Sequence, residues 1–166
     1  MPTSKKQAFY SPTLQQFFIV VALVVCITTY AQKSYSTTFE LLPKLMEANP
    51  KPIVIKLHAS WCGICKIQDK KIEKDKELQE LLKNSCYFIE LDGELKETIL
   101  YNGKEYGYKA YSKTNVSNEL ATELTQGNPS YPHWIFISAN YEIIDTYGGL
   151  LKADDLKAIL PKLSNY

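Results

Sequence analysis

Arginine is absent from this chain of 166 residues, and all 19 of its basic residues are lysines. Arginine usually provides the bidentate recognition of phosphate and guanine, so its absence disfavours a nucleic-acid role. Neither sign of charge predominates, because the 18 acidic residues nearly balance the lysines and leave a formal net charge of +1. Internal repeats and low-complexity stretches are missing as well. The length suits one globular domain with its own core.

Cysteine is scarce, with only 4 in the chain. Cys26 lies inside an N-terminal apolar run, and the bulky Val25 before it disfavours a lipidation site. The three that remain, Cys62, Cys65 and Cys86, do not fit a fully paired disulfide scaffold. They indicate one functional pair and one additional thiol. Because Cys86 falls within an apolar run, we expect it to be an inert core thiol.

The N-terminus differs from the rest of the chain in its long uncharged stretch. Lys5 and Lys6 precede an uncharged stretch over residues 7–32, which contains the apolar run 17–27 and ends near the small residue Ala31. This order is typical of a secretory signal peptide over residues 1–31. An uncleaved membrane anchor is the alternative, since flanking uncharged residues can extend the short apolar core. Both alternatives predict a periplasmic or otherwise extracytoplasmic protein.

After this segment, we expect a polar linker over residues 32–38 and one domain over residues 39–166. Short β-branched and aromatic runs predict strands at residues 53–59, 86–92, 133–138 and 141–147. Segments rich in Leu, Lys and Glu predict helices at residues 39–48, 66–82, 117–126 and 152–163. Thr37 or Thr38 is the expected cap of the first helix, and the second is expected to bend near Asp75.

The order of these elements predicts the fold class. A strand, a helix and a second strand in succession imply a parallel crossover. The last two predicted strands are joined by a short turn and should form an antiparallel hairpin. The sequence therefore predicts an α/β fold with a central mixed sheet and helices on both faces.

The stretch Trp61-Cys62-Gly63-Ile64-Cys65 carries the strongest chemical signal. It lies between a predicted strand and a predicted helix, so Cys62 is expected where free backbone N–H groups and the positive end of the helix dipole converge. That environment favours the thiolate, which is the attacking species in disulfide exchange. Cys65 lies one turn farther on, so the pair can switch between dithiol and disulfide.

Together with Ser130-Tyr131-Pro132 before the third strand, this motif resembles the thioredoxin superfamily from about Phe39 to the C-terminus. The chain is similar to small extracytoplasmic thioredoxin-like proteins related to the C-terminal domain of bacterial thiol–disulfide interchange proteins. The resemblance implies a protein-disulfide oxidoreductase in which Cys62 attacks and Cys65 resolves, with reduction of the partner as the favoured direction. It also implies a cis bond before Pro132 that presents the Tyr131 backbone to a substrate; the alternative is an ordinary trans proline that opens a strand. Trp61 is implied to shield the site and contact substrate, and the alternative is simple packing.

Lys56 departs from the family pattern, because the family often has a buried acid five residues before the tryptophan. A buried lysine needs a partner. We hypothesise that Lys56 pairs with Glu90 on the neighbouring strand and stabilises a thiolate; the alternative is that it reaches solvent. Asp69, four residues after Cys65, matches an acid of the interchange proteins and is a candidate for proton transfer. Alternatively, it is one acid on a charged helix.

The resemblance implies protein thiols and disulfides as partners, a dithiol electron donor in the membrane or envelope, and no cofactor. We expect a monomer. The tyrosine-rich segment 94–128 either selects partners or covers a sheet edge. Two other function classes stay open: a non-catalytic binding module with a static disulfide, and a metal-handling protein that uses Cys62, Cys65 and either His58 or His133. The favoured hypothesis includes no metal site.

Overall fold

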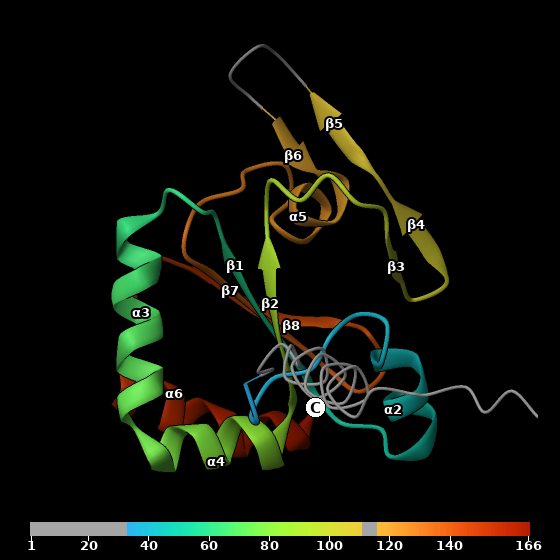
Figure 1. The fold of residues 1–166 in the computed structure, drawn as a ribbon. Helices are drawn as coiled ribbons and strands as arrows, with labels where there is room; N and C mark the ends of the chain where they lie inside the picture. The colour runs from blue at the N-terminus through green and yellow to red at the C-terminus, as the bar shows by residue number, and fades with distance from the viewer. Residues whose placement is uncertain (1–32, 111–115) are drawn as a thin grey trace, which may run out of the picture. The chain divides into compact units, whose positions relative to one another are not determined.

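The computed structural model describes residues 33–110 and 116–166 (Figure 1). The signal peptide or anchor predicted over residues 1–31 lies outside these ranges. Each helix within them is too short or too polar to span a bilayer.

A four-stranded sheet with the order β2-β1-β7-β8 forms the centre of the domain. Its strands are β1 (Ile53–His58), β2 (Tyr87–Asp92), β7 (His133–Ile137) and β8 (Ile143–Gly148). β1 and β2 run parallel, whereas β7 is antiparallel to both β1 and β8. The predicted parallel crossover, the hairpin and the mixed sheet are therefore confirmed.

The helices are α2 (Leu42–Ala48), α3 (Gly63–Lys74), α4 (Lys76–Ser85), α5 (Glu119–Leu124) and α6 (Ala153–Ile159), followed by the 3₁₀ helix η1 (Leu160–Asn165). The bend predicted near Asp75 is a complete break between α3 and α4. Asp75 ends α3 and caps α4, because its carboxylate accepts a hydrogen bond from the Leu78 N–H at 3.0 Å. Lys157 of α6 lies 2.9 Å from the same carboxylate and ties the break to the C-terminal helix.

Two apolar clusters occupy opposite faces of the sheet. On β1, Ile53, Ile55 and Leu57 pack with residues of α2 and α5, whereas Val54 packs with residues of α4 and α6. Successive side chains of a strand point to opposite faces, so this division shows that β1 is buried from both sides. The expected placement of helices on both faces is confirmed.

The start of the domain differs from the prediction. α2 begins at Leu42, later than predicted, and no side chain caps it. Thr38 contributes its backbone carbonyl to the Leu42 N–H at 3.1 Å, so the prediction of a Thr37 or Thr38 side-chain cap is wrong. Residues 33–38, expected to act as a linker, contact the sheet: Tyr35 is buried, and the Thr37 N–H donates to Phe88 O of β2 at 2.8 Å.

The tyrosine-rich segment contains more strand than predicted. It forms a hairpin of β3 (Ile99–Tyr101) and β4 (Lys104–Tyr106), then a second pair of β5 (Tyr108–Ala110) and β6 (Val116–Asn118). The helix expected from residue 117 begins at Glu119, because Ser117 and Asn118 belong to β6. Asn118 caps α5 by accepting from the Leu120 N–H at 3.0 Å.

Asn118 also anchors the preceding loop. Its side chain is fully buried, and its amide donates to the carbonyls of Leu95 and Glu97 at 3.2 and 3.3 Å. We predict that Asn118→Ala lowers the free energy of unfolding by about 2 kcal/mol, since a cap and two buried hydrogen bonds are lost. Urea unfolding measures this, with the exposed Asn84→Ala as the control. Equal effects of the two substitutions would contradict the anchoring role.

Candidate active site

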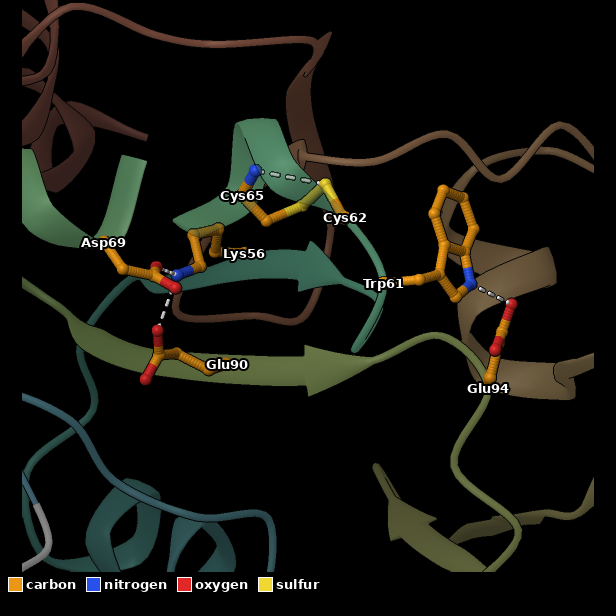
Figure 2. The surroundings of a disulfide bond; sticks show 7 residues. All are labelled: Lys56, Trp61, Cys62, Cys65, Asp69, Glu90 and Glu94. Atoms are coloured by element: carbon orange, nitrogen blue, oxygen red, sulfur yellow. Dashed lines mark hydrogen bonds and ion pairs between the residues drawn. A yellow bond between two sulfur atoms is a disulfide. The ribbon is translucent and has the colours of Figure 1, made fainter. Parts of the chain in front are cut away.

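A disulfide joins Cys62 and Cys65, with Cα atoms 5.3 Å apart (Figure 2). Cys62 is the N-cap of α3, and its Sγ accepts a hydrogen bond from the Cys65 N–H at 3.0 Å. The first N–H groups of a helix have no intrahelical partner, so here one of them is directed at sulfur. The predicted placement of the pair at a helix start is confirmed.

Both cysteines are buried, with exposed fractions of 4% for Cys62 and 2% for Cys65. Exposed apolar side chains lie next to them in the chain: Trp61 is 66% exposed, and Ile64 and Ile67 are each about half exposed. Large exposed apolar side chains gathered at one place are typical of a surface that contacts another protein. The buried pair is therefore bordered in the chain by exposed apolar side chains.

Trp61 is held at its polar edge. Its indole N–H donates to Glu94 Oε1 at 2.9 Å, and its ring meets the Tyr131 ring edge-to-face with centroids 5.6 Å apart. Figure 2 shows the indole directed toward Glu94. Glu94 was not predicted as a site residue; its position in the turn after the second strand was the available signal.

Tyr131 and Pro132 lie where the resemblance implied. The peptide bond between them is cis, as predicted. Tyr131 packs against the cluster of Ala59 and the two cysteines. Burial, reinforced by the carboxylates of Glu94 and Asp92, raises the pKa of the Tyr131 phenol to about 12. Tyr131 therefore stays neutral at physiological pH.

Lys56 is completely buried, and its ammonium contacts the carboxylates of Asp69 and Glu90. The Glu90 contact is 2.5 Å, and Lys56 and Glu90 are direct partners in the parallel register of β1 and β2. The predicted contact with Glu90 is confirmed, and the alternative that Lys56 reaches solvent is wrong. That Asp69 of α3 would join the same ammonium was not predicted.

A second lysine extends this cluster to the surface. Lys33 Nζ lies 3.0 Å from Glu90 Oε2 and retains partial exposure. Burial favours the neutral form of Glu90, but the attraction of Lys56 and Lys33 outweighs it, so the pKa of Glu90 lies below its usual value. Glu90 is therefore charged between two cations.

The two histidines and Cys86 do not form a metal site with the cysteine pair in the part of the chain that the structure describes. Burial lowers the pKa of both His58 and His133, and the Lys56 charge lowers that of His58 further. Within residues 33–110 and 116–166, no three His, Cys, Asp or Glu side chains are grouped to hold a metal ion. Burial raises the pKa of the Cys86 thiol to about 12, as expected of an inert core thiol.

Gly93, directly after β2, allows Tyr131 to approach closely. A Cβ at this position would lie 2.3 Å from the Tyr131 hydroxyl oxygen and 2.5 Å from the nearest ring carbon. We predict that Gly93→Ala displaces the Tyr131 ring, lowers the free energy of unfolding by about 1–3 kcal/mol and accelerates reduction of the disulfide by dithiothreitol. In Gly107→Ala, the matched control, the new methyl meets its nearest neighbour at 3.6 Å. Unchanged reduction in Gly93→Ala would show that Tyr131 does not protect the disulfide.

Comparison with known proteins agrees with this geometry. Residues 40–164 match the family profile described as Thioredoxin-like domain. Mitochondrial thioredoxin of Bos taurus is 22% identical over 162 residues, which covers 95% of this chain and 81% of that protein. A thioredoxin-fold protein from Helicobacter pylori superimposes with a TM-score of 0.54 at 13% identity, covering 70% of this chain and 71% of that one.

A thioredoxin from Thermus thermophilus superimposes with a TM-score of 0.51 at 16% identity, covering 75% of this chain and 85% of that one. At such identities the structural likeness concerns the fold, whereas the profile match spans most of the chain. The chain belongs to the thioredoxin-like domain family, as a member whose Cys-x-x-Cys pair forms a disulfide at the start of a helix.

Proposed function

We propose that the protein is a thiol–disulfide oxidoreductase that exchanges its Cys62–Cys65 pair with cysteines of partner proteins. The observation that carries this proposal is the disulfide at the N-terminus of α3, where a backbone N–H is directed at Cys62 Sγ. In the reduced protein the same N–H and the helix dipole favour a Cys62 thiolate. Membership of the thioredoxin-like domain family supports this chemistry.

The reaction follows from thiolate attack on a disulfide. The Cys62 thiolate attacks one sulfur of the partner disulfide, that S–S bond breaks, and the partner's other sulfur leaves as a thiolate. Cys65 then loses its proton and attacks Cys62 Sγ, which releases the partner's first sulfur. Both partner sulfurs take up protons. Two electrons pass to the partner, and Cys62 and Cys65 return to the disulfide.

Reduction of the partner is the direction that we propose. Its support is the likeness to thioredoxins, whose potential of about −270 mV lies at the reducing end of the superfamily. The re-reducing electrons would come from a dithiol protein of the membrane or envelope. The likeness to the C-terminal domain of bacterial interchange proteins, carried by the Cys-x-x-Cys motif and Asp69, supports such a donor.

The partner in this proposal is a protein. The support is the exposure of the apolar side chains Trp61, Ile64 and Ile67, which neighbour the buried cysteines in the chain. A small thiol gains little from such a surface, whereas a polypeptide buries it on docking.

The cysteine roles are tested by substitution. We predict that Cys62→Ser abolishes insulin reduction, and that Cys65→Ser accumulates a mixed disulfide with the partner because the resolving thiol is missing. Mass spectrometry under non-reducing conditions detects the adduct. Cys86→Ala is the matched control and retains turnover, since its thiol is buried and remains protonated. Reduction of insulin by Cys62→Ser would overturn the proposed function and favour a binding module with a static disulfide.

We also propose an extracytoplasmic location, supported by the lysines and the apolar run within residues 1–31. A fusion of residues 1–38 to alkaline phosphatase, an enzyme that becomes active only after export, tests it. We expect active phosphatase from this fusion in bacteria. Replacement of Val20, Val21 and Leu23 by aspartate should abolish that activity, and equal activity of the two fusions would contradict export by this segment.

A further inference from the structure

The surroundings of Lys56 are unusual for a lysine. Its side chain is completely buried, and its ammonium is shared between Asp69 of α3 and Glu90 of β2. Transfer of a single ammonium into the protein interior is strongly unfavourable unless carboxylates compensate it. Here two carboxylates do so, and Lys33 in turn compensates Glu90. Cations and anions thus alternate from the partly exposed Lys33 through Glu90 and Lys56 to Asp69 on α3.

This cluster reaches the face of α3 that carries Cys65. Asp69 follows Cys65 by four residues, so the two side chains lie on the same face of the helix, one turn apart. Figure 2 shows Lys56 directed from β1 toward the Asp69 carboxylate on this helix. The buried cation therefore contacts the turn of α3 that follows the second cysteine.

The pairing of Asp69 affects what this acid can do. Its carboxylate contacts the Lys56 ammonium directly, so Asp69 is one member of an ion cluster rather than an isolated acid. The charges of the cluster can influence the stability of a cysteine thiolate, because electrostatic interactions are stronger in the protein interior than in water.

We propose that Lys56 is a positioning residue of the redox site: its ammonium holds Asp69 and Glu90 in place and supplies the buried cation that favours the reduced, thiolate-bearing form of the cysteine pair. This inference rests on the proposed function, since it concerns the pair that carries out the exchange. It reverses the charge that the family often places at this position of the strand, where the resemblance implies a buried acid.

Other charged or titratable groups lie on the elements that carry or adjoin the cysteine pair. Outside the ion cluster they are His58 on β1, Asp92 on β2, Lys66 on α3, Glu94 and Tyr131 in the adjoining loops, and His133 on β7. Single substitutions at Lys56 or Asp69 leave all the others in place. A change caused by such a substitution can therefore be assigned to the cluster.

The cation and the anion of this cluster should act with opposite sign. Lys56→Met leaves two carboxylates near the pair, which disfavours a thiolate and stabilises the disulfide. Asp69→Asn leaves the Lys56 ammonium with Glu90 alone, which favours a thiolate and stabilises the reduced form. If Asp69 were instead the proton acceptor for Cys65, Asp69→Asn would slow exchange without favouring the reduced form. A purely structural cluster would leave the redox equilibrium unchanged in both variants.

The test is equilibration of the full chain with glutathione buffers at pH 7, with the reduced fraction measured by alkylation and mass spectrometry. We expect Lys56→Met to lower the equilibrium constant for reduction of the disulfide about tenfold, which is about 30 mV for two electrons. Asp69→Asn should raise it by a similar factor. The pH profile of Cys62 alkylation should move to higher pH in Lys56→Met and to lower pH in Asp69→Asn.

Lys157→Met is the matched control. Lys157 also binds two carboxylates, at 2.9 Å to Asp75 and 2.6 Å to Glu77, but it lies at the junction of α4 and α6. Its loss should leave the redox equilibrium unchanged. Should Lys56→Met fail to fold, Lys56→Met combined with Glu90→Gln removes both members of the pair, and the equilibrium constant should still fall because Asp69 remains.

Shifts in the same direction for Lys56→Met and Asp69→Asn, or no shift in either, would overturn the role of Lys56. An equal shift in Lys157→Met would do the same. Insulin reduction by the wild-type chain is measured separately. If the wild-type chain does not reduce insulin but the equilibrium constants of the two variants shift in opposite directions, the proposed function is wrong and the effect of Lys56 on the cysteine pair is supported. If the wild-type chain reduces insulin but neither variant changes the equilibrium constant, the proposed function is supported and the effect of Lys56 is wrong.

Discussion

The neutralisation of one buried ammonium constrains how this domain is assembled. Lys56 lies on the central strand β1, on the same face as Val54, where α3, α4 and α6 cover the sheet. With no route to water, the ammonium needs Asp69 of α3 and Glu90 of β2 beside it. A helix whose Asp69 must meet β1 also turns Cys65, Gln68 and Ile72 inward, and these are its buried residues. The rotation of α3, and with it the placement of the disulfide, is therefore coupled to the ion cluster.

Much of this arrangement was predictable because it depends on signals that are local in the chain. The strand runs are strongly apolar, and the parallel crossover follows from their order. Cys62 precedes the helical segment, so its place at a helix start did not require tertiary information. Even the contact of Lys56 with Glu90 followed from two neighbouring strands and the need of a buried lysine for a carboxylate.

The contacts that escaped prediction depend on how elements meet. The spacing of Asp69 from Cys65 places both on one face of α3, but it does not reveal that this face turns toward Lys56. The approach of Gly93 to Tyr131 and the contact of Trp61 with Glu94 join residues far apart in the sequence. The strands of the tyrosine-rich segment have only 3 residues each, too few for an alternating pattern to be recognised.

That same segment is fixed at the active-site end of the sheet, which gives it a direct connection with the cysteines. The Asn118 N–H donates to the Gly93 carbonyl at 2.7 Å, so the segment returns at Asn118 to the residue that follows β2. Gly93 contacts Tyr131, and Glu94 binds Trp61, so the residues at the start of the segment also position two aromatic rings that contact each other beside the cysteines. A change in how this segment packs would therefore be transmitted to Trp61 and Tyr131 beside the disulfide. In our proposal the ion cluster affects the charge near the thiols from inside the domain, whereas the tyrosine-rich segment affects access to them through Trp61 and Tyr131. Substitutions in one of these regions can therefore leave the other unchanged.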